Sequence, residues 1–369
     1  MKVGVARESD PGETRVAVVP DTARRLVGDA VETLVERGAG ETAAFSDGAY
    51  EDAGARLVSA EELYAEADVV CKVRRPSAEE VQRLRDGQVL VALLQPLVHP
   101  ELSRALAERG VTAFSLDSIP RVTRAQPMDA LSSQSTASGY KAAILAAERL
   151  GKFFPMLTTA AGTIPPAKIL VLGAGVAGLQ AIATARRLGA VVSAFDVRPV
   201  VKEQVESLGA AFLELDVEGA EGLGGYAVAL AEDQHAREQQ LIAHHAAGSD
   251  AVITTALVPG RPAPELITEE AVRGMATGSV IVDLAAEAGG NCAATEPGKT
   301  VVVDGVTIVG LTNLAATMPV HASQMYSRNV QAFVGLIVEE GALRLDFEDE
   351  IVRETCVAHG GKVMREPDD

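Results

Sequence analysis

The sequence predicts an α/β protein of two subdomains, each a mainly parallel sheet flanked by helices. Short apolar runs, typical of buried parallel strands, alternate with helical stretches along most of the chain. The alternation occurs twice, before residue 117 and after residue 168, and a polar stretch separates the two halves. A chain of 369 residues is also long for one hydrophobic core and comfortable for two.

The first half contains five strand candidates and two clear helical stretches. Strands are expected at Met1–Ala6, Glu32–Val35, Asp68–Val73, Val89–Leu94 and Val111–Leu116. Helices are expected at Asp21–Leu26, which follows Pro20, and at Glu101–Arg109. The next segment, Asp117–Thr136, is too irregular to predict an element, whereas Ser138–Phe154 has a helical pattern and could bridge two subdomains.

The second half begins at Lys168 and repeats the alternation. Its strands are expected at Ile169–Leu172, Val191–Asp196, Ala251–Thr255, Val280–Leu284 and Thr307–Gly310. The glycine-rich stretch Glu218–Tyr226 lacks an apolar period and indicates a mobile loop. The tail Met318–Leu345 is largely helical and should return to the first half. We therefore predict one Rossmann-like subdomain from residues 1–133 plus 318–369, and another from 134–317, with a linker helix at about 138–154.

The turn after the Ile169–Leu172 run carries the strongest chemical signal. Gly173, Gly175 and Gly178 have the G-x-G-x-x-G spacing between a strand and a helix, and Asp196 ends the next strand. Gly173 allows a tight turn, Gly175 admits a pyrophosphate to the backbone, and Gly178 lets helix and strand pack closely. Helix N-termini favour anions, so the pyrophosphate is expected there.

The carboxylate of Asp196 indicates which dinucleotide is bound. It is placed to accept hydrogen bonds from a ribose 2′-hydroxyl and would repel a 2′-phosphate, so the sequence predicts NAD(H) rather than NADP(H). The nearby Arg198 weakens that preference slightly. The plain alternative is a glycine turn without a ligand. We also place cofactor contacts at the neighbouring Val176, Val197 and Arg198.

Composition excludes several classes of partner. The net charge of −18 argues against nucleic acid and against anionic lipid as direct ligands. Three cysteines without a zinc or CxxC spacing indicate reduced thiols in a cytoplasmic protein, and the histidines form no metal-ligand pattern. The start lacks a signal peptide, and no run is long and apolar enough for a membrane span. Because neither the cysteines nor the histidines have a metal-ligand spacing, we also expect no metal.

A second concentration of polar residues lies between the two halves, at Ile119–Gly139. Arginine there can hold a phosphate or carboxylate, and glutamine can hold a carboxamide through both its donor and its acceptor. A cleft between subdomains is a common ligand site, although a solvated linker with helix caps explains the composition equally well. The candidate residues include Arg121, Arg124, Gln126, Asp129 and Ser132.

Several long motifs occur in order along essentially the whole chain. They are GETRVAVVP, RAQPMDALSSQ, GAGVAGLQAIATARRLGA, ITTALVPGRPAP and VIVDLAAEAGGNC. Together they resemble the NAD(H)-binding component of proton-translocating nicotinamide nucleotide transhydrogenase. Because the chain stops after a polar, acidic end, it looks like the version in which this component is a separate polypeptide.

The resemblance implies half of a Re/Si-specific NAD(P)⁺ transhydrogenase. In this family the component is a homodimer and binds NAD(H) between two Rossmann-like subdomains. Hydride passes between its nicotinamide and that of NADP(H), which is held on a soluble domain of the partner β subunit. A membrane-spanning subunit or domain couples the transfer to proton movement. The chain would then be cytoplasmic and peripheral to the inner membrane.

The resemblance also assigns roles to particular residues. Arg121, Gln126 and Asp129 match the family's residues near the nicotinamide, Gln126 orienting the ring, and Ser132 matches a serine that contacts the carboxamide. Tyr226 matches a tyrosine that ends a mobile loop and closes over the nucleotide, although it could simply anchor that loop. The family's backbone contacts to adenosine and ribose fall at Gly225, Ala256 and Leu257.

Two other functions compete with this interpretation. Alanine dehydrogenase shares the fold and uses an Arg, a Lys and a His, and Arg15 and Lys72 match the first two. Its histidine is expected at the end of the Val89–Leu94 strand, where this chain has Gln95 and no imidazole; His99 lies a few residues on, after a proline turn, and is expected at the surface. We therefore predict that Arg15 and Lys72 are structural or ion-pairing residues. A regulatory nucleotide-binding protein would keep the glycine turn without needing Gln126.

Overall fold

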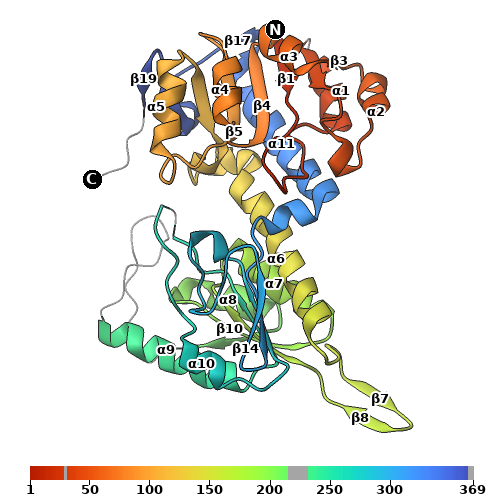
Figure 1. Ribbon diagram of the computed structural model, residues 1–369, viewed down its shortest axis with the longest axis vertical. Helices are drawn as coiled ribbons and strands as arrows, with labels where there is room; N and C mark the ends of the chain where they lie inside the picture. The colour runs from red at the N-terminus through yellow and green to blue at the C-terminus, as the bar shows by residue number, and fades with distance from the viewer. Residues whose placement is uncertain (29–30, 215–231, 259, 365–369) are drawn as a thin grey trace. The chain divides into compact units, whose positions relative to one another are not determined.

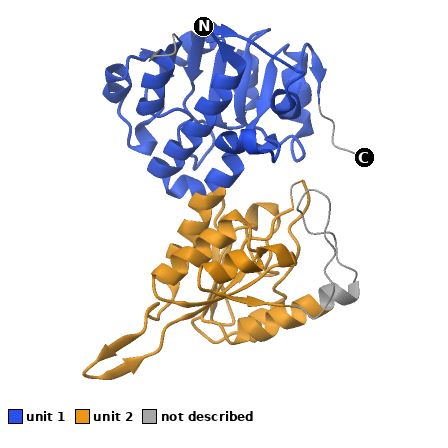
Figure 2. Ribbon diagram, turned by 180° about the vertical axis from the view of Figure 1, so that it is seen from behind, with its two compact units in different colours: residues 1–134, 315–369 blue, residues 135–314 orange. Residues whose placement is uncertain are grey.

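The computed structural model describes residues 1–28, 31–214, 232–258 and 260–364. Its contacts divide the chain into two compact units, which Figure 2 colours separately. Unit 1 comprises residues 1–134 and 315–369, and unit 2 comprises residues 135–314. The sequence placed these boundaries after residues 133 and 317, so the two divisions differ by one and three residues.

Unit 1 is built on an eight-stranded sheet with the order β19-β18-β6-β5-β4-β1-β2-β3. Its strands are β1 (Lys2–Val5), β2 (Glu32–Glu36), β3 (Arg56–Val58), β4 (Val69–Arg74), β5 (Val89–Leu93), β6 (Thr112–Ser115), β18 (Cys356–His359) and β19 (Lys362–Val363). The first six pair in parallel, and the last two are antiparallel additions at the edge. Its helices are α1 (Pro20–Gly28), α2 (Asp47–Asp52), α3 (Ala60–Glu66), α4 (Ala78–Arg83), α5 (Pro100–Glu108), α11 (Pro319–Ile337) and α12 (Glu350–Thr355).

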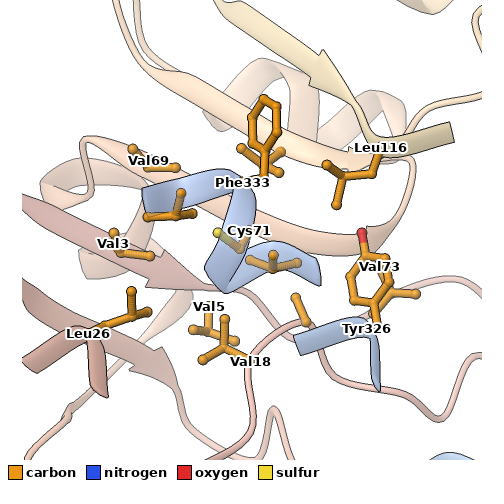
Figure 3. Close-up of a cluster of buried hydrophobic side chains, with 14 of the residues drawn as sticks. Val3, Val5, Val18, Leu26, Val69, Cys71, Val73, Leu116, Tyr326 and Phe333 are labelled. Carbon is orange, nitrogen blue, oxygen red and sulfur yellow. The ribbon is translucent and has the colours of Figure 1, made fainter. Parts of the chain in front are cut away.

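Successive side chains along each strand point to opposite faces of this sheet, so the strands contribute to two cores, one on each face. One core, shown in Figure 3, packs Val3, Val5 and Cys71 against Tyr326 and Phe333 of α11. The other face packs its strands against α3, α4 and α5. Because both faces are covered, the central strands are continuous apolar runs.

Unit 2 has a seven-stranded sheet with the order β11-β10-β9-β12-β13-β15-β14. The strands are β9 (Lys168–Leu172), β10 (Val191–Phe195), β11 (Ala211–Leu213), β12 (Ala251–Thr254), β13 (Val280–Asp283), β14 (Thr300–Val303) and β15 (Val306–Val309). The helices are α7 (Val176–Arg187), α8 (Lys202–Ser207), α9 (Glu232–Ala247) and α10 (Glu269–Arg273). A separate hairpin, β7 (Leu157–Thr159) and β8 (Gly162–Ile164), extends away from the sheet (Figure 1).

The second sheet also buries both of its faces. Ile169 and Val171 of β9 pack with residues of α6 (Ala130–Arg149) and α7, whereas Leu170 and Leu172 pack with α9 and α10. Both sheets share one winding order. The chain lays its first three strands outward on one side, then returns to place the fourth beside the first. This order creates a topological switch point between the first and fourth strands of each sheet.

The segment between the subdomains corrects the sequence prediction. Asp117–Thr136 was expected to form no element, but residues 123–128 form a 3-10 helix and α6 begins at Ala130. The side chain of Asp129 accepts hydrogen bonds from the backbone N–H and the hydroxyl of Ser132, at 2.8 and 2.6 Å. This cap starts the helix eight residues earlier than the predicted position, Ser138.

The C-terminal tail differs in the same way. Helix α11 ends at Ile337, and a short hairpin of β16 (Val338–Glu339) and β17 (Ala342–Leu343) follows. Glu340 and Gly341 have positive φ values of 51° and 74°, which suit a tight turn and cannot continue a helix. Over the residues the structure describes, no helix combines the length and apolarity that crossing a bilayer requires.

The remaining elements are short 3-10 turns. They lie at Glu41–Ala43, Leu116–Ser118, Pro199–Val201, Ala286–Ala288 and Leu314–Thr317.

Candidate nucleotide-binding site

The turn between β9 and α7 has the geometry that its glycine spacing predicts. Gly173 has a φ of 92°, and a Cβ there would lie 2.7 Å from the hydroxyl of Thr255. A Cβ on Gly178 would lie 1.9 Å from the carbonyl oxygen of Gly173. These two positions therefore require glycine for the turn itself and for the close contact of helix with strand.

Gly175 is different, because the space around it is open. It is the N-cap residue of α7, and the nearest atom to a Cβ built there is Nη2 of Arg198, at 4.0 Å. Its φ of −75° is accessible to any residue, so the fold itself does not require a glycine. Open backbone at the N-terminus of a twelve-residue helix suits a phosphate, which fits the expected dinucleotide.

Asp196 follows β10 directly and reaches back to this turn. Its Oδ2 accepts a hydrogen bond from the backbone N–H of Ala174 at 2.7 Å. The guanidinium of Arg198 binds both carboxylate oxygens, with Nε to Oδ1 at 3.0 Å and Nη2 to Oδ2 at 2.9 Å. The backbone N–H of Arg198 also donates to Oδ1, at 2.9 Å. The side-chain hydrogen bond to Asp196 raises the pKa of Arg198 above its ordinary value.

The loop after β12 forms the other side of the switch point. The hydroxyl of Thr255 donates to the carbonyl of Gly173 at 3.1 Å, which joins the two loops. The peptide groups of Ala256 are held by the buried side chain of Asn291, which accepts from its N–H at 3.0 Å and donates to its carbonyl at 2.9 Å. Leu257 then lies half exposed beyond this fixed peptide.

A second buried residue, Asp283, fixes the loop that carries Asn291. Its carboxylate accepts from the hydroxyl of Thr254 at 2.8 Å and from the backbone N–H of Asn291 at 2.8 Å. Three further donors complete the set, from Ala285 N, Cys292 N and the Thr295 hydroxyl. Asn291 and Asp283 were not predicted from the sequence, because their partners are distant in sequence and a spacing rule cannot reveal them.

The predicted site residues of unit 1 lie around the start of α6. Arg121 and Gln126 are exposed, and Asp129 and Ser132 pair with each other as described above. Among the described residues, none hydrogen-bonds the side-chain amide of Gln126, so that group can serve a ligand. Arg124 instead binds Asp349 through both of its terminal nitrogens, at 2.6 and 2.7 Å.

A buried polar network holds the backbone around the start of α6. Arg15 donates to both carboxylate oxygens of Glu13, at 2.8 and 2.6 Å, and to the side-chain oxygen of Gln134 at 2.8 Å. Ser133 links the network to Asn329, which donates to the carbonyl of Pro127 at 2.8 Å. The backbone next to Gln126 is thus fixed by residues of α11.

Lys72 of β4 lies in a second buried cluster, with Glu8, which follows β1, and Glu80 of α4. Its ammonium group contacts Glu80 at 2.7 Å and Glu8 at 3.7 Å. Burial opposes the charge on Lys72, but the two carboxylates outweigh it, so its pKa is raised. Burial raises the pKa of Glu8 to about 7, despite the attraction of Lys72 and the N–H of Val73. Arg15 and Lys72 are therefore ion-pairing residues, as predicted.

At the end of β5, Gln95 stands where alanine dehydrogenase was expected to have its histidine, and the carboxyl of Asp117 lies beside it. Gln95 has a positive φ of 54°, and its backbone N–H donates to Asp117 at 2.9 Å. Burial raises the pKa of Asp117, and its hydrogen bonds to Ser115 and to the N–H groups of Leu94 and Gln95 oppose that shift. This carboxylate shapes the strand end.

Two predicted cofactor contacts, Gly225 and Tyr226, lie outside the described residues. Val176 lies half exposed at the first turn of α7, and Val197 between Asp196 and Arg198 packs partly into the core beside α9 and α10. Of the predicted contacts of unit 2, the structure gathers those that it describes around one turn, at the switch point between β9 and β12.

The winding of unit 2, its glycine turn and the carboxylate of Asp196 define a Rossmann-type nucleotide-binding protein. Comparison with known families then gives the particular group. Residues 4–138 match the alanine dehydrogenase/PNT N-terminal domain, and residues 142–366 match the alanine dehydrogenase/PNT C-terminal domain. The chain belongs to this family, and its high-identity curated relatives are α subunits of NAD(P) transhydrogenase.

Individual relatives show how far the similarity extends. The chain is 47% identical to the first of the α-subunit polypeptides of NAD(P) transhydrogenase from Rhodospirillum rubrum, over 99% of this chain and 98% of the relative. A transhydrogenase structure from Sinorhizobium meliloti is 46% identical, with a TM-score of 0.87 over 98% of both chains. Alanine dehydrogenase is more distant: that of Halomonas elongata is 31% identical over 98% of this chain and 94% of the relative.

Proposed function

We propose that this chain is the NAD(H)-binding component of a proton-translocating, Re/Si-specific NAD(P)⁺ transhydrogenase. The supporting observation is the combination of full-length similarity to transhydrogenase α subunits with an open Gly175 turn beside Asp196. The second nucleotide, NADP(H), would be held on a soluble domain of a β subunit. A homodimer of this chain would lie at the cytoplasmic face of the inner membrane and meet a membrane-spanning subunit there.

In this function the chain contributes binding and orientation. When bound, NADH supplies a hydride from its nicotinamide ring. The N-terminus of α7 would hold the pyrophosphate, and Asp196 would accept hydrogen bonds from the adenosine ribose. Backbone at Ala256 and Leu257 would line the adenosine, together with Val176, Val197, Arg198, Gly225 and Tyr226.

The residues of unit 1 would act on the nicotinamide end. Gln126 has an amide that is free of hydrogen bonds within the described chain, and it would orient the ring towards the partner's nucleotide. Arg121 would supply positive charge. Ser132 would contact the ring's carboxamide from the capped start of α6, and Asp129, its hydrogen-bond partner, would lie near the ring. Hydride transfer needs two rings in near-attack geometry, so these residues would position and need not exchange protons.

The alternative, an alanine dehydrogenase, is disfavoured by what surrounds Arg15 and Lys72. Arg15 is 3% exposed and already pairs with Glu13 and Gln134, and Lys72 is 1% exposed and pairs with Glu80. Gln95 stands after β5 in place of the expected histidine, and His99, four residues further on, is partly exposed and pairs with Glu101. These contacts account for both charges without a substrate.

The test compares two reaction mixtures containing the purified chain and NADH. The first adds a thionicotinamide analogue of NADP⁺ and the soluble NADP(H)-binding domain of a transhydrogenase. The second adds pyruvate and ammonium without a partner. We expect NADH oxidation only in the first. Turnover in the second would identify an alanine dehydrogenase, and NADH binding without turnover in either would favour a regulatory binder.

A further inference from the structure

The carboxylate of Asp196 already has all the hydrogen bonds it can accept. Two oxygens offer about four lone-pair directions. Oδ1 accepts from the backbone N–H and Nε of Arg198, and Oδ2 accepts from the N–H of Ala174 and from Nη2 of Arg198. The side chain of Asp196 is only 6% exposed. A ribose diol therefore cannot be accommodated by simple addition.

The four donors differ in how easily they can leave. The two backbone N–H groups belong to the turn and to the start of the next segment, so removing them would distort the fold. The guanidinium of Arg198 is a flexible side chain, 28% exposed, whose Nη2 borders the open space at Gly175. It is the donor that can move without disturbing the backbone.

We propose that Arg198 is a positioning residue that holds Asp196 in the free protein, and that the nucleotide's ribose displaces its guanidinium from the carboxylate. This inference rests on the proposed function and adds that NAD(H) binding carries the cost of breaking an existing ion pair. It also bears on selectivity. The guanidinium neutralises Asp196, so it weakens the repulsion with which that carboxylate rejects a 2′-phosphate.

The experiment measures the binding of four probes by calorimetry: NADH, 5′-AMP, 2′-AMP, and 2′,3′-dideoxy-5′-AMP, the last of which lacks both ribose hydroxyls. The full-length chain is compared with Arg198→Met, Asp196→Asn and the double variant. Arg273→Met is the matched control, because Arg273 is an exposed, ion-paired arginine of the same unit. Arg198→Lys, which keeps the charge but loses the two-pronged contact, serves if Arg198→Met folds poorly.

We expect Arg198→Met to bind 5′-AMP about fivefold more tightly, the equivalent of about one net hydrogen bond. The dideoxy probe should show no gain, and Asp196→Asn should abolish the gain in the double variant. A merely structural role for Arg198 would alter both AMP probes alike. Arg198→Met should also bind 2′-AMP more weakly than the unaltered chain does.

Unchanged or weaker binding of 5′-AMP by Arg198→Met, with the unaltered chain still binding NADH, would overturn this inference and leave the proposed function standing. An equal gain for the dideoxy probe would overturn it as well, since the ribose hydroxyls would then not be involved. If the unaltered chain bound neither NADH nor 5′-AMP, the inference and the proposed function would both fail.

Discussion

The two sheets share one winding order, yet their switch points differ: that of unit 1 is filled by buried charged side chains, whereas that of unit 2 has open backbone. Between β1 and β4 of unit 1, the switch point is filled by the buried Lys72 of β4 and by Glu8 and Glu80, which both pair with it. Between β9 and β12 of unit 2, the backbone is bare at Gly175. Topology provides a place where a ligand can bind, and the residues at and after the strand ends decide whether it stays open.

The largest effect should come from removing a charge from the filled switch point. Lys72→Met would leave Glu8 and Glu80 buried without their cation, and breaking such a pair costs about 3–5 kcal/mol. Denaturant unfolding monitored by circular dichroism measures the loss. Lys299→Met is the control: its pair with Glu296 is exposed and should contribute less than about 1 kcal/mol.

The same variant separates the two enzyme interpretations. If Lys72 were a substrate-binding lysine, its loss would leave the unfolding midpoint near that of the unaltered chain. A stable Lys72→Met protein would thus contradict the structural role that its burial indicates.

The next effect concerns two glycines that are three residues apart. Gly178→Ala places a Cβ 1.9 Å from the carbonyl of Gly173 and should destabilise the fold by about 1–3 kcal/mol. Gly175→Ala adds the same methyl group to open space, so it should change stability by less than about 1 kcal/mol. It should nevertheless weaken NADH binding about tenfold, by keeping the pyrophosphate from the helix N-terminus.

Thermal unfolding and NADH titration of both variants give this comparison directly. The two properties should separate: Gly178→Ala should lower stability, and Gly175→Ala should lower the affinity for NADH. If Gly175→Ala bound NADH normally, the open turn would not be the phosphate site.

A smaller effect is expected from Gln126, the exposed amide of unit 1. Gln126→Asn shortens the side chain by one methylene, so hydride transfer in the reconstituted assay should slow about tenfold through misplacement of the ring. NADH affinity should stay within about twofold. Gln82→Asn, an exposed glutamine of α4, is the matched control. A large loss of NADH affinity in Gln126→Asn would contradict the orienting role.

The strands of both units could be predicted because buried parallel strands are continuous apolar runs. Predicted strands such as Ile169–Leu172 and Val280–Leu284 agree with β9 and β13 to within one residue. The short edge strands β3 and β11 were missed, since three residues carry no periodic signal. The start of α6 was missed because serines compete for backbone hydrogen bonds. The signal that could have revealed it is Asp129 with Ser132 three residues on.

The residues of the candidate site divide in the same way, into those that local spacing reveals and those that only the folded structure reveals. The glycine turn and Asp196 follow from local spacing, so the sequence predicted them. The pair of hydrogen bonds from the Arg198 guanidinium to the Asp196 carboxylate depends on side-chain geometry, which residue spacing does not reveal. Asn291 and Asn329 could not be predicted either, because the backbone groups they bind are brought near them only by the folded chain.

The last effect, and the sharpest test of the filled switch point, is the pH dependence that Glu8 imparts. Its pKa is about 7 in the folded chain because of burial, and near 4.5 when unfolded. Between these values the folded state binds more protons than the unfolded state, so the free energy of unfolding falls as the pH rises. The contribution of Glu8 is complete below pH 4.5 and is lost by about pH 7.

Glu8→Gln replaces the carboxyl with a neutral group of similar size and should remove this dependence. The difference in unfolding free energy between the variant and the unaltered chain should grow from pH 4.5 to 7, by at most about 1.4 kcal/mol per pH unit. It should then level off, because Glu8 is ionised in both states above that range. Urea unfolding at half-unit steps of pH measures the difference, in which distant titrating groups cancel. A constant difference would mean that Lys72 holds Glu8 ionised throughout, and that the cluster is a charged triad at every pH.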